Sequence, residues 1–224
     1  MPFKLTTTSL PDAVYLALRE SIIATLDPPG SVLTEATVSA RYTVARPTAK
    51  AAIERLVSEG LLRRSTNRTA RVPVLNESDI EDLHAIRIVV EVAALRNLAA
   101  DRTVPAGALS AHRELLAAAD IGGAATFARA DIAFHRALVL GQSSPRLARM
   151  HALIMGEIEL CIGQVDSKRL LTASNVAVQH QGILDAVAGG EPELAGTRTR
   201  EHILTSRDRL LGHIHGAPGA SSGA

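Results

Sequence analysis

The stretch PPGSVLTEATVSARYTVARPTAKAAIERLVSEGLLRR, residues 28–64, decides the fold of the N-terminal part of the chain. Thr34 is a favourable N-cap residue, so a short helix is expected over 35–41. A second helix is expected over about 46–59, and Gly60 is suited to end it because glycine readily adopts the left-handed conformation found after helices. Its inward-facing positions are predicted to be Ala49, Ile53, Leu56 and Val57.

The flanking sequence extends this pattern in both directions. Before it, Ser9 can cap a helix that starts at Pro11. After it, residues 61–64 and 70–74 are predicted to form two strands, joined by a turn at 65–68. Helix, short helix, turn, helix and hairpin are the elements of a winged helix-turn-helix in order. The sequence therefore predicts a winged helix-turn-helix domain over residues 1–75.

The charge of the chain is unevenly distributed. The formal net charge is only +1, yet residues 41–71 contain eight basic and two acidic residues. Such a local excess suits a polyanion, although an ordinary solvated face would have a similar charge. The basic residues are Arg41, Arg46, Lys50, Arg55, Arg63, Arg64, Arg68 and Arg71.

Specific DNA contacts can be assigned because the second helix of a helix-turn-helix enters the major groove. Arg46 and Lys50 are four residues apart and share a helix face, with Thr48 in the same segment. Arg46 can bridge the two acceptors of a guanine edge, and Lys50 can reach a base or a phosphate. Arg41 is expected at the DNA backbone. Arg68, at the wing tip, is expected at the minor groove or a phosphate.

The remainder of the chain contains helical patterns and no strand pattern. Residues 76–78 are predicted to be a linker, with Ser78 capping the first helix. The fold class is therefore mainly α: the winged helix plus an all-α six-helix bundle over 79–215, with a disordered tail at 216–224. The expected helices span 79–101, 105–119, 123–142, 144–164, 168–189 and 191–214.

Composition limits the class of protein. Apolar residues make up 46% of the 224, with a mean hydropathy of +0.14, as expected for a folded chain. No stretch reaches the roughly 18 apolar residues of a membrane span, so no membrane association is expected. The one cysteine, Cys161, cannot form an internal disulfide, which suits the cytoplasm, and its apolar neighbours predict burial.

Four residues of the helical domain could bind a metal ion. Asp131 and His135 are one helical turn apart, while His180 and His202 lie on the fifth and sixth predicted helices. Side chains from facing helices commonly build metal sites inside bundles. On spacing alone, the simpler interpretation is an Asp–His pair on a helix surface. The other histidines fit no motif and are interpreted as surface or core residues: His84, His112, His151, His213 and His215.

Residues 10–75 resemble the DNA-binding domain of GntR-type regulators, in which Pro-Gly, Leu-Thr-Glu, an arginine-bearing turn and Glu-Gly-Leu follow in this order. Two departures are Ala45, where the family has a capping serine, and the replacement of the wing glycine around Thr69. Residues 79–214 resemble the FCD effector domain of the FadR branch, and the six-helix count resembles its VanR-like subgroup. The motifs are Asp82-Leu83, Ile86-Arg87 with Glu91, Asp131-xxx-His135, His180-xx-Ile183-Leu184-x-Ala186 and His202-Ile203.

The resemblance implies that Asp131, His135, His180 and His202 hold a divalent metal, zinc or nickel. It also implies that Arg87 helps to hold the carboxylate of a small organic-acid effector. The alternative partner of Arg87 is Glu91, one turn along the helix. The function expected is a ligand-responsive repressor that binds a short inverted repeat in double-stranded DNA as a homodimer.

Two other functions remain open at this stage. One is a metalloenzyme that uses the Asp/His site, with an accessory winged helix. It needs a general base, and the acidic candidates Glu157 and Glu159 have no motif to place them. The other is an interaction module without a DNA role, for which the residues of 41–71 would be surface charges.

Overall fold

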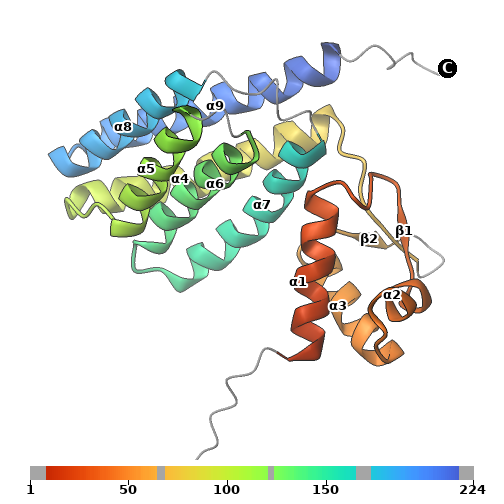
Figure 1. Ribbon diagram of the computed structural model, residues 1–224. Coiled ribbons are helices and arrows are strands. Elements are labelled where there is room, and N and C mark those ends of the chain that lie inside the picture. Colours follow the sequence, from red (N-terminus) through yellow and green to blue (C-terminus); the bar gives the residue numbers. More distant parts are fainter. Residues whose placement is uncertain (1–8, 65–68, 121–123, 165–172, 217–224) are drawn as a thin grey trace, which may run out of the picture. The chain divides into compact units, whose positions relative to one another are not determined.

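The computed structural model describes residues 9–64, 69–120, 124–164 and 173–216 (Figure 1). The chain divides into two compact units, Met1–Val74 and Leu75–Ala224. The predicted wing turn with Arg68 lies outside the described residues. So do the predicted tail from residue 217 onward and the predicted start of the fifth helix of the bundle.

Three helices form the frame of the N-terminal unit: α1 (Leu10–Ile23), α2 (Glu35–Tyr42) and α3 (Arg46–Ser58). Ser9 caps α1 as predicted, because its hydroxyl accepts a hydrogen bond from the Asp12 amide. Thr34 caps α2, also as predicted, in a reciprocal capping box with Thr37. The start of α2 is therefore fixed by side-chain hydrogen bonds from both capping residues.

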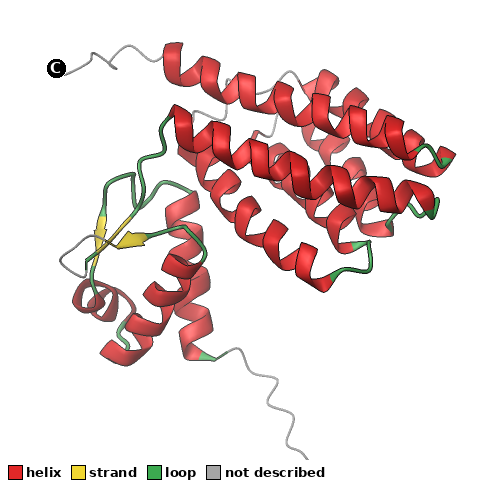
Figure 2. Cartoon of the chain, turned by 180° about the vertical axis from the view of Figure 1, so that it is seen from behind, coloured by secondary structure: helices red, strands yellow, loops and turns green. Residues whose placement is uncertain are grey.

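A small antiparallel sheet completes this unit (Figure 2). Its strands are β1 (Val32–Leu33), β2 (Arg63–Arg64) and β3 (Ala70–Arg71), with β3 in the centre. The sequence predicted only the β2–β3 hairpin, because two residues of β1 are too few to show an alternating pattern. The predicted strands were too long: Leu61 and Leu62 instead lie buried in the core.

The core of the N-terminal unit lies between α1, α2, α3 and the sheet. On α3, Ala52 is buried and Val57 only half-buried, so the prediction that Val57 faces inward was wrong. The remaining predicted inward positions of α3 are buried. Apolar residues of this core include Val14, Leu18, Ile22, Leu33, Val38, Ala49, Ile53, Leu56, Leu61 and Val72.

In its described residues the C-terminal unit contains six helices and no strand, as predicted. The helix α4 begins at Glu77, and Asn76 caps it in a reciprocal capping box with Asp79. The prediction of a linker at 76–78, with Ser78 as the cap, was therefore wrong: Asn76 is itself a strong cap. The helices are α4 (Glu77–Ala100), α5 (Ala106–Asp120), α6 (Ala124–Leu140), α7 (Pro145–Gln164), α8 (Ala173–Gly189) and α9 (Pro192–Gly216).

The helix α4 is at the centre of the C-terminal unit, since it packs against α6, α7, α8 and α9. One large apolar cluster joins α4, α5, α6, α8 and α9, with Phe134 among its largest members. Cys161 on α7 is buried, as predicted. None of the described helices has the length and hydropathy needed to cross a membrane.

Candidate functional site

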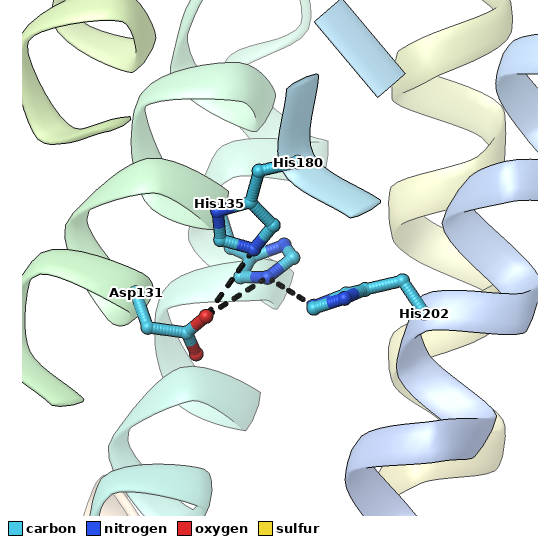
Figure 3. Close-up of side chains that lie close together, drawn as sticks. All are labelled: Asp131, His135, His180 and His202. Carbon is cyan, nitrogen blue, oxygen red and sulfur yellow. Dashed lines mark hydrogen bonds and ion pairs between the residues drawn. The ribbon is translucent and has the colours of Figure 1, made fainter. Parts of the chain in front are cut away.

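Asp131, His135, His180 and His202 converge inside the C-terminal unit (Figure 3). Asp131 and His135 are one turn apart on α6, whereas His180 comes from α8 and His202 from α9. One ligand atom from each residue lies within 4.8 Å of the others. The three imidazoles are buried, and the Asp131 side chain is 17% exposed. The fold thus brings together four residues that are up to 71 positions apart in the sequence.

The close contacts within this cluster involve atoms that commonly bind metals. His180 Nε2 lies 3.2 Å from Asp131 Oδ1, and His135 Nε2 lies 3.0 Å from His202 Nε2. The His180 ring stacks on Phe134 with centroids 3.8 Å apart and planes 9° apart. Neither nitrogen of His180 has a hydrogen-bond partner among the described residues. Stacking on Phe134 and the contact of Nε2 with Asp131 thus orient this ring toward the cluster.

A fully buried carboxylate, Glu91 on α4, lies behind the cluster. Its Oε1 accepts a hydrogen bond from Arg87 Nε at 2.6 Å, and its Oε2 lies 2.7 Å from His135 Nδ1. His151 Nε2, from α7, is 3.1 Å from Glu91 Oε1. The sequence identified the Arg87–Glu91 pair. It missed the contacts with His135 and His151, which are 44 and 60 residues away and leave no local pattern.

Gln179 on α8 is the other polar residue that the sequence missed. Its Oε1 lies 3.0 Å from His202 Nδ1. The same two residues line a cavity of about 490 Å³ between α8 and α9. A glutamine one position before a histidine follows no recognised motif, so only the fold reveals it. The other residues lining this cavity are Val178, Gln181, Gly182, Asp185, Arg198 and Glu201.

The environment sets the protonation states of these groups. Burial lowers the pKa of His135 to about 4 and holds that of His202 well below its usual range. For Asp131, burial alone would raise the pKa, but the imidazoles of His180, His135 and His202 outweigh it, so the pKa is lowered. Glu91 likewise has a low pKa because Arg87 and His135 outweigh its burial. At neutral pH the cluster therefore combines ionised carboxylates with two neutral imidazoles, those of His135 and His202.

Two buried side chains near this network, Arg87 and His84, each have one nitrogen atom without a hydrogen-bond partner among the described residues. The Nη2 of Arg87 has no hydrogen-bond partner among the described residues, although its guanidinium is only 1% exposed. His84 Nδ1 is 2.8 Å from the Ile80 carbonyl oxygen, and its Nε2 is likewise unpaired. The sequence left open whether His84, His112 and His151 lie at the surface or in the core. All three are buried and so lie in the core.

The N-terminus of α3 presents the residues predicted to contact DNA. Arg46 and Lys50 are exposed, and Thr48 is half-buried. Arg46 has no ion-pair partner within the described ranges, whereas Lys50 Nζ lies 3.7 Å from Glu54 Oε1. Ala45, the N-cap residue, supplies no side-chain hydrogen bond, as its replacement of a capping serine implied.

Other arginines of the basic stretch have structural roles that the sequence did not predict. Arg41 donates two hydrogen bonds to Asp27, at 2.7 and 2.8 Å, and this contact lowers the pKa of Asp27. Arg55 forms ion pairs with Asp12 and Glu59 and lies 3.6 Å from the centre of the Tyr15 ring. The positive charge of residues 41–71 is therefore partly neutralised by α1 and the segment after it.

A winged helix with an exposed basic helix N-terminus, followed by a helical unit with a buried polar centre, defines a two-domain DNA-binding regulator. Comparison with known families agrees with this class. Residues 10–72 match the bacterial regulatory proteins of the gntR family, and residues 82–205 match the FCD domain. The chain belongs to the GntR family of transcriptional regulators, in its FCD branch.

Individual relatives are regulators as well. The chain is 28% identical, over 80% of its length and 76% of the relative, to a probable D-xylose utilization operon transcriptional repressor of Paenarthrobacter nicotinovorans. A putative GntR regulator from Rhodococcus sp. RHA1 is 25% identical, with a TM-score of 0.78 over 90% of this chain and 97% of its own. E. coli McbR/YncC shares the fold at 17% identity, with a TM-score of 0.77 over 93% and 100%. The chain is thus a transcriptional regulator, and these relatives do not support the metalloenzyme alternative.

Proposed function

We propose that this regulator is a repressor whose helical unit binds a divalent metal and, through it, a small carboxylate effector. The observation that carries the proposal is the buried meeting of one carboxylate and three imidazoles, with ligand atoms within 4.8 Å of one another. Neutral imidazoles favour Zn²⁺ or Ni²⁺ over Mg²⁺, which prefers oxygen ligands. His180 supports the assignment: its Nδ1 has no hydrogen-bond partner among the described residues, its Nε2 faces Asp131 Oδ1 at 3.2 Å, and buried polar atoms without hydrogen bonds are uncommon.

The residues around the cluster suit an anionic effector. A bound metal with open coordination positions supplies a Lewis acid for the effector's carboxylate oxygen. Arg87 supplies the second anchor: Nε is engaged by Glu91, while Nη2 is buried without a partner and can donate to the carboxylate. The two explanations weighed for Arg87 are therefore compatible, since different atoms of the guanidinium serve each.

For the DNA-binding unit we propose that Arg46 contacts base edges, that Thr48 and Lys50 contact bases or phosphates, and that Arg41 contacts the backbone. The exposure of Arg46 and Lys50 at the N-terminus of α3 supports this assignment. Arg41 keeps 43% of its side chain exposed while pairing with Asp27, so a phosphate contact is compatible with that pair. We also propose that Arg68 contacts DNA from the wing, on the basis of its position in the sequence alone.

A homodimer on a short inverted repeat completes the proposal, because one winged helix reads few base pairs. Exposed apolar residues on two helices that pack together, α4 and α7, support an interface between copies of the C-terminal unit. These residues are Ile86, Val89, Met150 and Leu153. Light scattering at micromolar concentration should give the dimer mass. A monomer that also binds DNA singly would contradict this part.

The test of the metal centre is elemental analysis of the purified protein with thermal melting in the presence and absence of EDTA. We expect about one Zn²⁺ or Ni²⁺ per chain and a lower melting temperature after chelation, because the metal joins three helices. His180→Ala and His202→Ala should lose the metal. His112→Leu, which removes a buried histidine outside the cluster, should retain it. Wild-type protein without stoichiometric metal, whose melting EDTA leaves unchanged, would overturn the assignment.

The regulatory part of the proposal has its own test. Deleting the gene should raise transcription from the promoter that the protein binds. Restoring the gene with His202→Ala, the variant expected to lose the metal, should alter the response to organic acids. A promoter whose transcription falls on deletion would show activation in place of repression.

A further inference from the structure

Resting on the metal centre proposed above, we propose that Glu91 and Gln179 are positioning residues for that metal. Each accepts a hydrogen bond from the Nδ1–H of one histidine and so fixes the tautomer in which Nε2 is unprotonated. Glu91 acts on His135, and Gln179 acts on His202.

The assignment for His135 follows from the chemistry of Glu91. An ionised carboxylate can only accept hydrogen bonds, so the nitrogen 2.7 Å from Oε2 must carry the proton. Glu91 is held ionised by the Arg87 guanidinium, whose Nε lies 2.6 Å from Oε1. A neutral imidazole with its proton on Nδ1 has its lone pair on Nε2. Nε2 of His135 is the atom that faces Asp131 and His202.

The same reasoning applies to His202. The Gln179 amide oxygen is an acceptor, and it lies 3.0 Å from His202 Nδ1. His202 Nε2 is therefore the unprotonated nitrogen, and it points at His135. In metal sites, the second ring nitrogen of a ligating histidine usually donates to such an acceptor, which fixes the ring orientation and raises ligand basicity.

The two assignments together explain the contact between His135 Nε2 and His202 Nε2 at 3.0 Å. With both protons on Nδ1, two lone pairs face each other, and no N–H is available to join them. A cation between or beside these nitrogens removes the repulsion. His180 differs from both, since its Nδ1 has no hydrogen-bond acceptor among the described residues, and its ring is placed by stacking on Phe134 and by the contact of Nε2 with Asp131.

The two positioning residues should contribute unequally. Glu91 is charged, fully buried and contacted also by Arg87 and His151, so its position is strongly constrained. Gln179 is neutral, half-buried and lies on the wall of the α8–α9 cavity. We therefore expect the loss of Glu91 to cost more metal affinity than the loss of Gln179.

The direct test is the tautomeric state in metal-free protein, measured by two-bond ¹H–¹⁵N correlation spectra with ¹⁵N-labelled histidine. Wild-type His135 and His202 should both carry the proton on Nδ1. In Gln179→Leu, His202 should lose this preference while His135 keeps it. In Glu91→Gln, the amide NH₂ can face His135 Nδ1 and should move the proton to Nε2. Either residue found protonated on Nε2 in the wild type would overturn the proposal for that residue.

Metal affinity, measured by competition with a chromophoric Zn²⁺ chelator, is the second readout. Glu91→Gln should weaken Zn²⁺ binding about 10- to 100-fold, Gln179→Leu should weaken it less, and Gln179→Glu, which still accepts, should bind at least as tightly as wild type. The control is Glu159→Gln, another buried glutamate, paired with Arg136 outside the cluster. Equal losses from Glu91→Gln and Glu159→Gln would contradict a specific role.

Folding and metal binding can each fail separately in these experiments. If Glu91→Gln does not fold, Arg87→Met/Glu91→Leu removes both buried charges and should leave His135 without a single tautomer. If wild-type protein binds no metal, the proposed function fails, while the tautomers of the metal-free protein still decide whether Glu91 and Gln179 fix the two rings.

Discussion

The two units place their polar side chains in opposite ways. Among the described residues, the N-terminal unit buries one polar or charged side chain, that of Asp27, whereas the C-terminal unit buries ten. Arg46 and Lys50, two of the residues proposed to read DNA, are exposed in the first turns of α3. The candidate metal ligands come from three helices and are enclosed. A surface function can thus be encoded locally, whereas an interior site depends on the whole fold.

This difference has an energetic side. Exposed ion pairs contribute little to stability, typically below about 1 kcal/mol. A buried charge that loses its partner costs several times more. The C-terminal unit should therefore be far more sensitive to the removal of single polar groups, and to acid, than the N-terminal unit. The following predictions test that contrast.

The largest effect is expected from breaking the Arg87–Glu91 pair. Arg87→Met leaves Glu91 buried without its main counter-charge and should lower the free energy of unfolding by about 3–5 kcal/mol. Arg41→Met, which breaks the pair with Asp27, should cost clearly less, because Ser21 still donates a hydrogen bond to the Asp27 carboxylate and the Arg41 side chain is 43% exposed. Urea unfolding measures both. Similar losses from the two variants would remove the contrast between the units.

Acid should affect the C-terminal unit first. Burial, aided by Arg87 and Arg207 and opposed by Glu91, lowers the pKa of His84 from 6.5 to about 4. Between these values the unfolded chain binds more protons, so the stability from neutral His84 is complete above pH 6.5 and lost as pH falls to about 4. The loss is on the order of 3 kcal/mol. Asp27 has a lowered pKa, so its contribution declines only below about pH 4.

Urea unfolding of metal-free protein from pH 7.5 to 4 checks this prediction. Substituting His84 by leucine should reduce the pH dependence of the C-terminal transition, to which His135 and His202 still contribute, and leave the N-terminal one unchanged. A variant with an unchanged slope would place the acid sensitivity elsewhere.

DNA readout should depend on the free arginine of α3. Arg46→Ala should cost roughly 1–3 kcal/mol on the operator and relax preference at one base position. Arg41→Ala should weaken binding on all sequences and reduce its salt dependence. Arg55→Ala is the matched control, because Arg55 is paired with Asp12 and Glu59. Binding curves on the operator and on single-base variants measure these effects, and equal losses of specificity at Arg41 and Arg46 would refute the assigned roles.

The smallest effect is expected at the N-cap of α3. Ala45→Ser can add the side-chain hydrogen bond that is missing there and should raise the stability of the N-terminal unit by roughly 0.5–1 kcal/mol. The rise in melting temperature of that unit measures it, with Ala45→Val as the variant that cannot form the bond. Identical melting of the two variants would mean that the cap does not form.

The same contrast explains what the sequence could predict. The caps Ser9 and Thr34, the order of elements and the exposed residues of α3 follow from nearby residues, and each was predictable. The Asn76 cap was missed because the following Ser78 has the same chemistry. The strand β1 was missed because its pairing with β3 is not local.

In the helical unit, the four candidate ligands were identified mainly through family resemblance, because their spacing of 4, 45 and 22 residues carries little information by itself. Glu91 was identified only as the neighbour of Arg87, and Gln179 and His151 not at all. Their roles depend on helix packing, which places His151 of α7 against α4 and Gln179 beside His202.

The burial of Cys161 has a consequence for chemical modification. It is the single cysteine of the chain and is 2% exposed, so the thiol is protected from reagents in water and from disulfide exchange. A cysteine introduced at an exposed position, such as that of Val178, becomes the one reactive thiol per chain. Spin labels attached there would report the spacing between two copies, and its change with effector, without altering the native thiol.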